Sequence, residues 1–209
     1  MKPRFRPLLA AIVAMTFWQT AFLAEAGKAG RHLGPEVARE QSAHAREVSI
    51  APFTLNGVAL VQDRGKNELA DFKSPATRLC PPFCVQPAAV AGVTTIQVED
   101  FVRLAPEINV GRILIVDMRT PDWYAQGTLP GAINIPYSDL IGPEATVKAT
   151  LRRLEGKDVI GFCNGWWCSQ SPTALNALIQ MKYPGKLHYF RGGSQDWHDA
   201  GLPFSIPMP

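Results

Sequence analysis

The sequence predicts an α/β fold in which helices cover both faces of an open parallel sheet, preceded by an irregular N-terminal extension. Apolar stretches of strand length recur along the second half of the chain, at 112–119, 129–137, 158–163 and 186–193. Segments expected to be helical lie around and between them, at 93–106, 146–157, 171–183 and 194–201. Strands that are joined through helices of this length pair in parallel, and the connecting helices then cover the sheet.

Each predicted helix has support in its local sequence. Thr95 is the expected cap of the first helix, and the second follows from the spacing of its valine and leucines. Pro172 stands in the first turn of the third helix, where an amide hydrogen would have no acceptor within the helix. The fourth helix is short and ends at Gly201, because glycine suits the position after a helix.

Length and composition indicate one main globular domain with an appendage: 209 residues, 46% hydrophobic and 19% charged. Residues 1–26 predict an export signal, with a basic start, an apolar run and a final Ala24-Glu25-Ala26 that suits cleavage. Polar residues interrupt the apolar run, which disfavours an uncleaved membrane anchor. Cleavage would lower the formal net charge from +3 to +1 and leave no basic cluster. We therefore expect a periplasmic or otherwise exported protein without a nucleic-acid or membrane partner.

Residues 27–93 are predicted to form an extension or linker. Asn56-Gly57, between apolar residues at 53–61, predicts a hairpin. The later sequence CPPFC places Cys80 and Cys84 around two prolines, which favours an extended segment clipped by a structural disulfide. A second redox pair that exchanges with the later cysteines is the alternative. The domain itself is expected over 94–204, followed by a tail at 205–209.

The segment FCNGWWCSQSP, residues 162–172, carries the candidate site. Cys163 ends a predicted strand, and the loop after it leads directly into a helix. Ligands and reactive residues lie at this point of an open α/β sheet, and loop amides with a helix N-terminus stabilise a thiolate, a persulfide or an oxyanion. A thiol placed here should have a lowered pKa and be a better nucleophile. A small buried cysteine, or a short disulfide to Cys168, is the alternative.

Three segments resemble the rhodanese domain in order and spacing, over residues 94–204: DMRTPDWYAQGTLPGAINIPY, DVIGFC before a glycine-containing loop, and FRGGSQDWHDAGLPF. The resemblance implies a sulfurtransferase, or an inactive regulatory relative, that carries sulfur as a persulfide on Cys163. It matches Asp117 and Arg119 to the family's aspartate and arginine at a strand end. The family's mainly structural GG and tryptophan correspond to Gly192, Gly193 and Trp197.

The loop departs from the family pattern at its sixth position. The family has arginine or lysine there, and this cation holds anionic donors such as thiosulfate, whereas this chain has Cys168. The loss of a bidentate oxyanion ligand argues against efficient use of thiosulfate. Arg119 and Arg191, at neighbouring strand ends, are candidates to replace it. Thr128 stands where the family commonly has histidine, and we expect only a surface contact to change.

Cys168 leaves several functions open. As a resolving thiol it would attack a persulfide or disulfide on Cys163, and in a permanent disulfide it would silence the loop. A third option is a relay in which both thiols hold sulfur. We favour a reversible Cys163–Cys168 couple in an exported sulfurtransferase or sulfur carrier. A thiol–disulfide oxidoreductase and a catalytically inactive docking module are the alternatives.

The rest of the loop is predicted to bind an anion or substrate. Its tryptophans would exclude water from a persulfide or form a docking surface, and its serines would donate hydrogen bonds. For Trp167, packing on the sheet edge is the preferred interpretation. For Ser171, capping of the helix is preferred. The residues of this predicted binding loop are Asn164, Gly165, Trp166, Trp167, Ser169, Gln170 and Ser171.

The expected partners are a small sulfur-containing donor, a thiol acceptor and a periplasmic reductant. An exported redox or sulfur-metabolism protein is the candidate macromolecular partner. We expect no cofactor. We also expect no metal, because a zinc site made from all four cysteines would lack the usual two-residue spacings.

Overall fold

The computed structural model describes residues 43–65 and 84–207. Its centre is a five-stranded sheet in the order β3-β7-β6-β4-β5, in which all neighbours are parallel. Strands β4 and β6 lie inside this sheet, consist almost entirely of apolar residues and are buried on both faces, as parallel strands require. The predicted open parallel sheet is confirmed. Its strands are β3 (Thr94–Ile96), β4 (Ile113–Asp117), β5 (Ile133–Asn134), β6 (Asp158–Phe162) and β7 (Leu187–Phe190).

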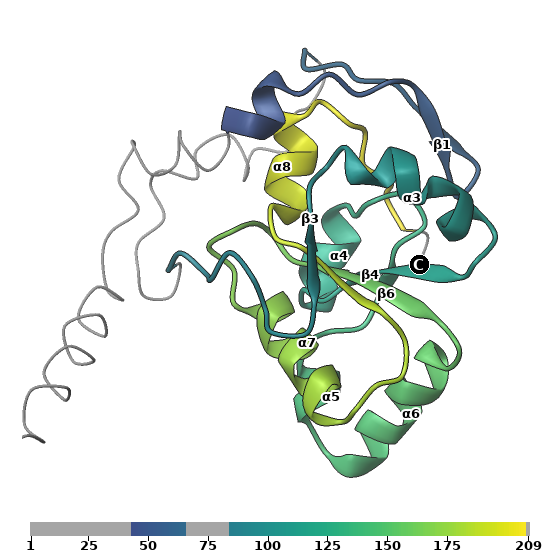
Figure 1. Cartoon of the computed structure of the whole chain (residues 1–209), viewed down its shortest axis with the longest axis vertical. Helices are drawn as coiled ribbons and strands as arrows, with labels where there is room; N and C mark the ends of the chain where they lie inside the picture. Colours follow the sequence, from purple (N-terminus) through teal and green to yellow (C-terminus); the bar gives the residue numbers. More distant parts are fainter. Residues whose placement is uncertain (1–42, 66–83, 208–209) are drawn as a thin grey trace, which may run out of the picture.

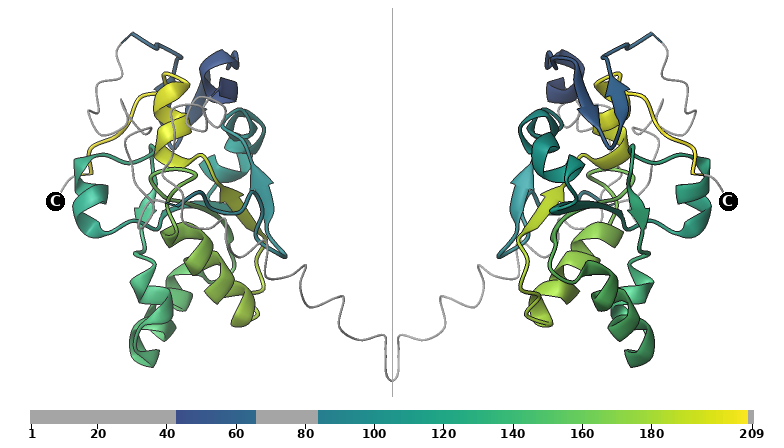
Figure 2. Two further views of the ribbon diagram at one scale, coloured as in Figure 1. Left: turned by 90° about the vertical axis from the view of Figure 1, so that its left-hand side faces the viewer. Right: turned by 90° about the vertical axis from the view of Figure 1, so that its right-hand side faces the viewer.

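Helices cover both faces of this sheet, as Figures 1 and 2 show. One face carries α3 (Asp100–Asn109) and α8 (Gly193–Asp199). The opposite face carries α5 (Ser138–Ile141), α6 (Glu144–Leu154) and α7 (Gln170–Gln180). The short α4 (Pro121–Gln126) connects β4 to β5 and contains no buried residue.

Two apolar cores result, one on each face of the sheet. Strand β4 shows how one strand supplies both, because successive side chains of a strand point to opposite faces. Ile113 and Ile115 belong to the core beneath α3 and α8. Leu114 and Val116 pack into the core beneath α5, α6 and α7. The sheet therefore lies between two apolar layers, one on each of its faces.

Residues 43–65, within the predicted linker, complete the first of these cores. Residues 43–47 are helical, and β1 (Phe53–Leu55) pairs with β2 (Val58–Leu60) in an antiparallel hairpin, which confirms that prediction. The turn residues Asn56 and Gly57 have φ of 48° and 81°, which suits this residue pair. Leu55 and Leu60 are almost fully buried, each contributing about 1.5 to 3 kcal/mol by burial.

Two predicted helix starts are wrong. Thr95 does not cap a helix: it lies in β3, which pairs with β7, and α3 starts after Glu99. Cross-strand pairing of a β-branched segment overrides the local helix signal there. Helix α7 starts at Gln170 with Ser169 before it, so Ser171 is not its cap and is buried in the first turn. Pro172 remains within that turn, where its missing amide hydrogen is tolerated.

Some predictions fall on residues that the structure does not describe. The export signal, Cys80 and the last residues of the tail lie outside the described ranges. Within the described ranges, no helix has the length and apolar character needed to cross a membrane.

Candidate functional site

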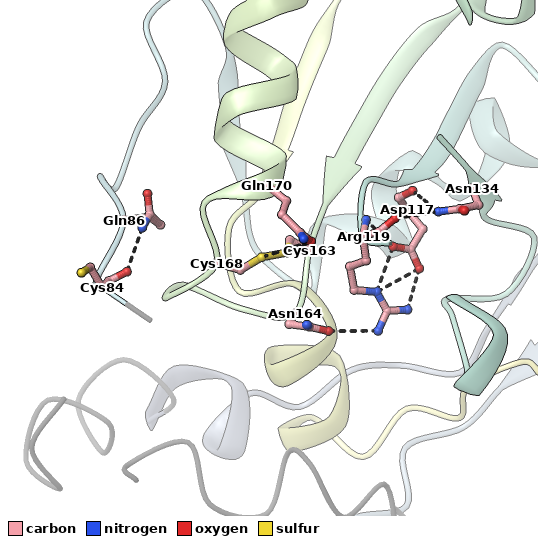
Figure 3. Close-up of a disulfide and its surroundings, with 9 residues drawn as sticks. All are labelled: Cys84, Gln86, Asp117, Arg119, Asn134, Cys163, Asn164, Cys168 and Gln170. Carbon is pink, nitrogen blue, oxygen red and sulfur yellow. Dashed lines mark hydrogen bonds and ion pairs between the residues drawn. A yellow bond between two sulfur atoms is a disulfide. The ribbon is translucent and has the colours of Figure 1, made fainter. Parts of the chain in front are cut away.

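Cys163 directly follows β6, where the carboxyl ends of three adjacent parallel strands meet. Phe162, the last residue of β6, is in register with Asp117 of β4 and with Phe190 of β7. The loop 163–169 then leads into the N-terminus of the 11-residue helix α7. The expected position of the loop is therefore confirmed, and Figure 3 shows the residues around it.

The loop is anchored through its carbonyl oxygens. The amides of Ser194 and Gln195, in the first turn of α8, donate to the carbonyl oxygens of Cys163 and Asn164 at 3.0 and 2.9 Å. The amide of Gln86 donates to the carbonyl oxygen of Trp166 at 2.8 Å. These three bonds occupy carbonyl groups and no loop amides, which is the arrangement that a loop needs if its amides are to face an anion.

Gly193 allows the close approach of α8 to the loop. Its φ is +54°, and a Cβ atom at this position would lie 2.1 Å from the carbonyl oxygen of Cys163. We expect Gly193→Ala to lower the free energy of unfolding by at least about 2 kcal/mol, because strain and a backbone clash add. Urea unfolding followed by tryptophan fluorescence measures this loss.

Gly156→Ala is the matched control for that substitution. Gly156 also has a positive φ, +71°, but a Cβ atom there would have no neighbour within 4 Å. Its expected cost is about 1 to 2 kcal/mol, from backbone strain alone. Equal losses in the two variants would contradict a steric role of Gly193 beneath the loop.

Cys163 and Cys168 form a disulfide across the loop, with their Cα atoms 6.2 Å apart. Cys163 is 1% exposed, whereas Cys168 is half-buried. The Oε1 atom of Gln170 lies 3.3 Å from Sγ of Cys163 and 3.7 Å from Sγ of Cys168. Neither sulfur of a disulfide carries a proton, so this is a polar contact in the oxidised state. After reduction, the same amide can accept from a thiol or, turned over, donate to a thiolate.

Trp166 and Trp167 are both buried, which agrees with packing rather than with an exposed docking surface. Their rings meet edge to face, with centroids 4.8 Å apart. Gly165 makes room for this pair, because a Cβ atom there would lie 2.5 Å from the Trp167 ring. The aromatic pair is thus part of the packed interior of the domain.

Arg119 is committed to a buried network and is not a spare cation. It binds both carboxylate oxygens of Asp117, the carbonyl oxygen of Gly127 at 2.6 Å and Oδ1 of Asn164 at 3.0 Å. The hydroxyl of Thr128 donates to the same carboxylate at 2.7 Å. The expectation that Thr128 makes only a surface contact is therefore wrong. Arg119 reaches the loop only through the side chain of Asn164.

Arg191 holds the segment after Cys84 against the domain. Its guanidinium donates to the carbonyl oxygens of Gln86 at 2.6 Å and Pro87 at 3.1 Å. Because Gln86 also binds the loop at Trp166, this segment joins Arg191 to the loop 163–169. Cys84 is itself disulfide-bonded, and its candidate partner Cys80 lies outside the described residues. Neither arginine that was expected to replace the missing loop cation is therefore placed as an anion ligand.

Asp196 is a buried acid in the helix that anchors the loop. Burial, together with the nearby Asp199, raises the pKa of its carboxyl group to about 7 against the opposing effects of Arg191 and His44. Between about pH 4 and pH 7 the native state therefore holds a proton that the unfolded chain has released. This group lowers the free energy of unfolding as pH rises through that window.

Asp196→Asn should remove this pH dependence. We expect the variant to gain about 2 to 4 kcal/mol over the native sequence between pH 4 and pH 8, because the native carboxylate must ionise in a buried site. Urea unfolding at several pH values measures the difference. Ser194→Ala is the control, since Ser194 is equally buried but does not titrate. Parallel pH profiles for all three proteins would contradict the prediction.

The structure brings together most of the predicted site residues. The binding-loop residues, Asp117 and Arg119 lie around the disulfide, while Arg191 donates to the carbonyl oxygens of residues 86 and 87. The sequence did not identify Gln86, Thr128 or the amides of α8 as parts of the site. For the amides of α8, the pair Gly192-Gly193 was the only signal in the sequence. Within the described ranges, no group of three or more His, Cys, Asp or Glu residues could hold a metal ion.

Comparison with known proteins agrees with this geometry. Residues 102–200 match the family described as rhodanese-like domain. A sulfurtransferase of Allochromatium vinosum is 30% identical over 95 residues, which cover 46% of this chain and 80% of that protein. An HTH-type transcriptional regulator of Mycobacterium tuberculosis is 32% identical over 102 residues, covering 48% of this chain and 41% of the regulator.

A solved structure with a similar chain path is a thiosulfate sulfurtransferase of Pseudomonas aeruginosa. It is 23% identical, covers 54% of this chain and 20% of that chain, and has a TM-score of 0.43.

Proposed function

Because this chain belongs to the rhodanese-like sulfurtransferase family, we propose that it is an exported sulfurtransferase or sulfur carrier that forms a persulfide on Cys163. The observation that carries the proposal is the position of Cys163, between the end of β6 and the N-terminus of α7. A thiolate at a helix N-terminus is stabilised by the helix dipole and by nearby amides. Export is supported by the character of residues 1–26.

The reaction needs the disulfide to be opened first. A thiol reductant in the exported compartment converts the Cys163–Cys168 pair into two thiols. The Cys163 thiolate then attacks the sulfane sulfur of a small donor, and the donor's remaining group leaves with the electron pair. An acceptor thiolate removes the outer sulfur of the persulfide and regenerates Cys163. The burial of Cys163, which is 1% exposed, supports the intermediate because it limits the access of water to this sulfur.

Intact mass measurement tests the proposal. The protein is reduced, freed of reductant and incubated with a polysulfide; we expect a gain of one sulfur, about 32 Da, on the nucleophilic cysteine. The gain should be lost in Cys163→Ser and kept in Cys168→Ser. An adduct that survives in Cys163→Ser, or no adduct on the reduced protein, would overturn the proposal.

A thiol–disulfide oxidoreductase is the second candidate, and the disulfide itself favours it. In that function the pair would exchange electrons with a partner thiol pair and hold no sulfane sulfur. Equilibration with glutathione buffers, together with the mass measurement, separates the two functions. A reversible potential without any sulfur adduct would favour the oxidoreductase, and a disulfide that resists both treatments would favour a docking module.

A further inference from the structure

We propose that the oxidised loop is itself a substrate-binding state whose substrate is inorganic sulfide. The HS⁻ ion attacks Sγ of Cys168, the bond between Cys163 and Cys168 breaks, and Cys163 leaves as a thiolate. The product carries a persulfide on Cys168. This inference rests on the proposed function in that it names a sulfur source for the same loop.

The accessibility of the two cysteines decides where the attack occurs. A nucleophile approaches a disulfide sulfur from the side opposite to the departing sulfur. Cys163 is 1% exposed at the end of a buried strand, whereas Cys168 is half-buried and is followed by the exposed Ser169. In Figure 3, Cys168 lies on the side facing Cys84 and Gln86, and Cys163 lies on the side of the sheet. Of the two cysteines, Cys168 is therefore the more accessible to a nucleophile.

The position of Cys163 is compatible with a leaving thiolate. A thiol of lower pKa leaves a disulfide faster, and a cysteine before a helix N-terminus is stabilised as a thiolate. Cys163 stands at the carboxyl end of the sheet before α7, an 11-residue helix. The atom of Gln170 that lies 3.3 Å from its sulfur is the acceptor Oε1, so this side chain stabilises the leaving thiolate only when its amide turns over to present the NH₂ group. Both cysteines precede α7, Cys168 by only two residues, so the difference in accessibility decides the direction of cleavage.

The charges around the loop favour sulfide over an oxyanion donor. Arg119 is occupied by Asp117, and Arg191 is occupied by the carbonyl oxygens of Gln86 and Pro87. Cys168 occupies the loop position at which the family's cation would bind such a donor. A small ion with a single charge requires no bidentate ligand, and it can reach a half-buried sulfur.

The step balances without another reagent. Sulfide supplies its electron pair to form the new bond to Cys168, and the electrons of the broken bond go to the sulfur of Cys163. The sulfide sulfur is oxidised to the sulfane level, and the disulfide is the oxidant. One disulfide therefore takes up one HS⁻ ion and becomes one persulfide and one thiolate.

The test uses the oxidised native protein and one equivalent of sodium sulfide without oxygen. We expect a mass gain of about 34 Da, because the opened product contains one added H₂S. Rapid alkylation followed by chymotryptic cleavage after Trp166 or Trp167 separates the two cysteines. The earliest alkylated persulfide should lie on the fragment with Cys168. The same treatment with thiosulfate should leave the disulfide closed.

Three results would overturn the inference: an intact disulfide, recovery of the plain dithiol alone, or a first persulfide on Cys163. Cys163→Ser and Cys168→Ser cannot form the loop disulfide and keep only the one that involves Cys84, so any gain of about 34 Da in these variants measures that second disulfide, and the excess in the native protein belongs to the loop. The native protein alone decides the outcome even where a variant folds poorly. Reduced protein with polysulfide tests the proposed function separately, so a sulfur adduct there with a closed disulfide here would remove only this inference.

Discussion

Replacement of Arg119 by methionine is expected to lower the free energy of unfolding by about 3 to 5 kcal/mol. The side chains of Arg119 and Asp117 are 1% and 0% exposed, so removal of the guanidinium leaves a carboxylate in the core without its counter-ion. The hydroxyl of Thr128 and the backbone amide of residue 119 continue to donate to that carboxylate, but two neutral donors do not offset the cost of a buried charge. Urea unfolding monitored by tryptophan fluorescence measures the loss.

Arg103→Met is the matched control for that prediction. Arg103 pairs with Asp100 at 2.9 Å on the exposed surface of α3, and its side chain is 67% exposed. Exposed pairs of this kind contribute about 0 to 1 kcal/mol. A comparably small loss in both variants would contradict the idea that Arg119 neutralises a buried carboxylate. It would show instead that hydrogen bonds alone are sufficient for Asp117.

Cys168→Arg is expected to raise thiosulfate-dependent sulfur transfer by about 10- to 100-fold. Charge-assisted hydrogen bonds to a guanidinium contribute about 1.5 to 3 kcal/mol, which corresponds to this range. The substitution restores the cation of the family's loop at a half-buried position, from which a long side chain can reach solvent. Steady-state kcat/KM for the transfer of sulfur from thiosulfate to cyanide measures the gain.

Cys168→Ser controls for the second effect of that substitution. Both variants remove the disulfide and leave Cys163 as a free thiol, so their difference isolates the guanidinium. We expect the serine variant to use thiosulfate poorly at any concentration of reductant. Equal rates in the two variants would show that the missing cation is not the reason for poor use of thiosulfate.

The α/β fold could be predicted because its signals are local. The apolar strands at 112–119, 158–163 and 186–193 need no tertiary information, since a strand buried on both faces is apolar throughout. The edge strand β3 could not be predicted, because its three residues gain their structure from pairing with β7. The part of the predicted linker at 43–65 proved to belong to the core for a similar reason. Its few apolar residues become informative only once α3 and α8 provide a surface for them.

The candidate site was predictable in part. The place of Cys163 follows from the strand, loop and helix that surround it in the sequence. Contacts across long sequence separations were not predictable, among them the bonds from Gln86 to Trp166 and from Thr128 to Asp117. Arg191 is the clearest example. The sequence places this residue at a strand end, but it does not show in which direction the side chain points. The structure directs its guanidinium to the carbonyl oxygens of residues 86 and 87.

By itself, the sequence determined the apolar strands β4, β6 and β7, the cysteine at the end of β6 and the absence of a cation at the sixth loop position. Only the tertiary structure decided that Cys163 is the buried sulfur and Cys168 the more accessible one, and that both candidate arginines are occupied. The physical reason is that element type depends on periodicity along the chain. Exposure and charge pairing depend instead on which distant segments pack against each side chain.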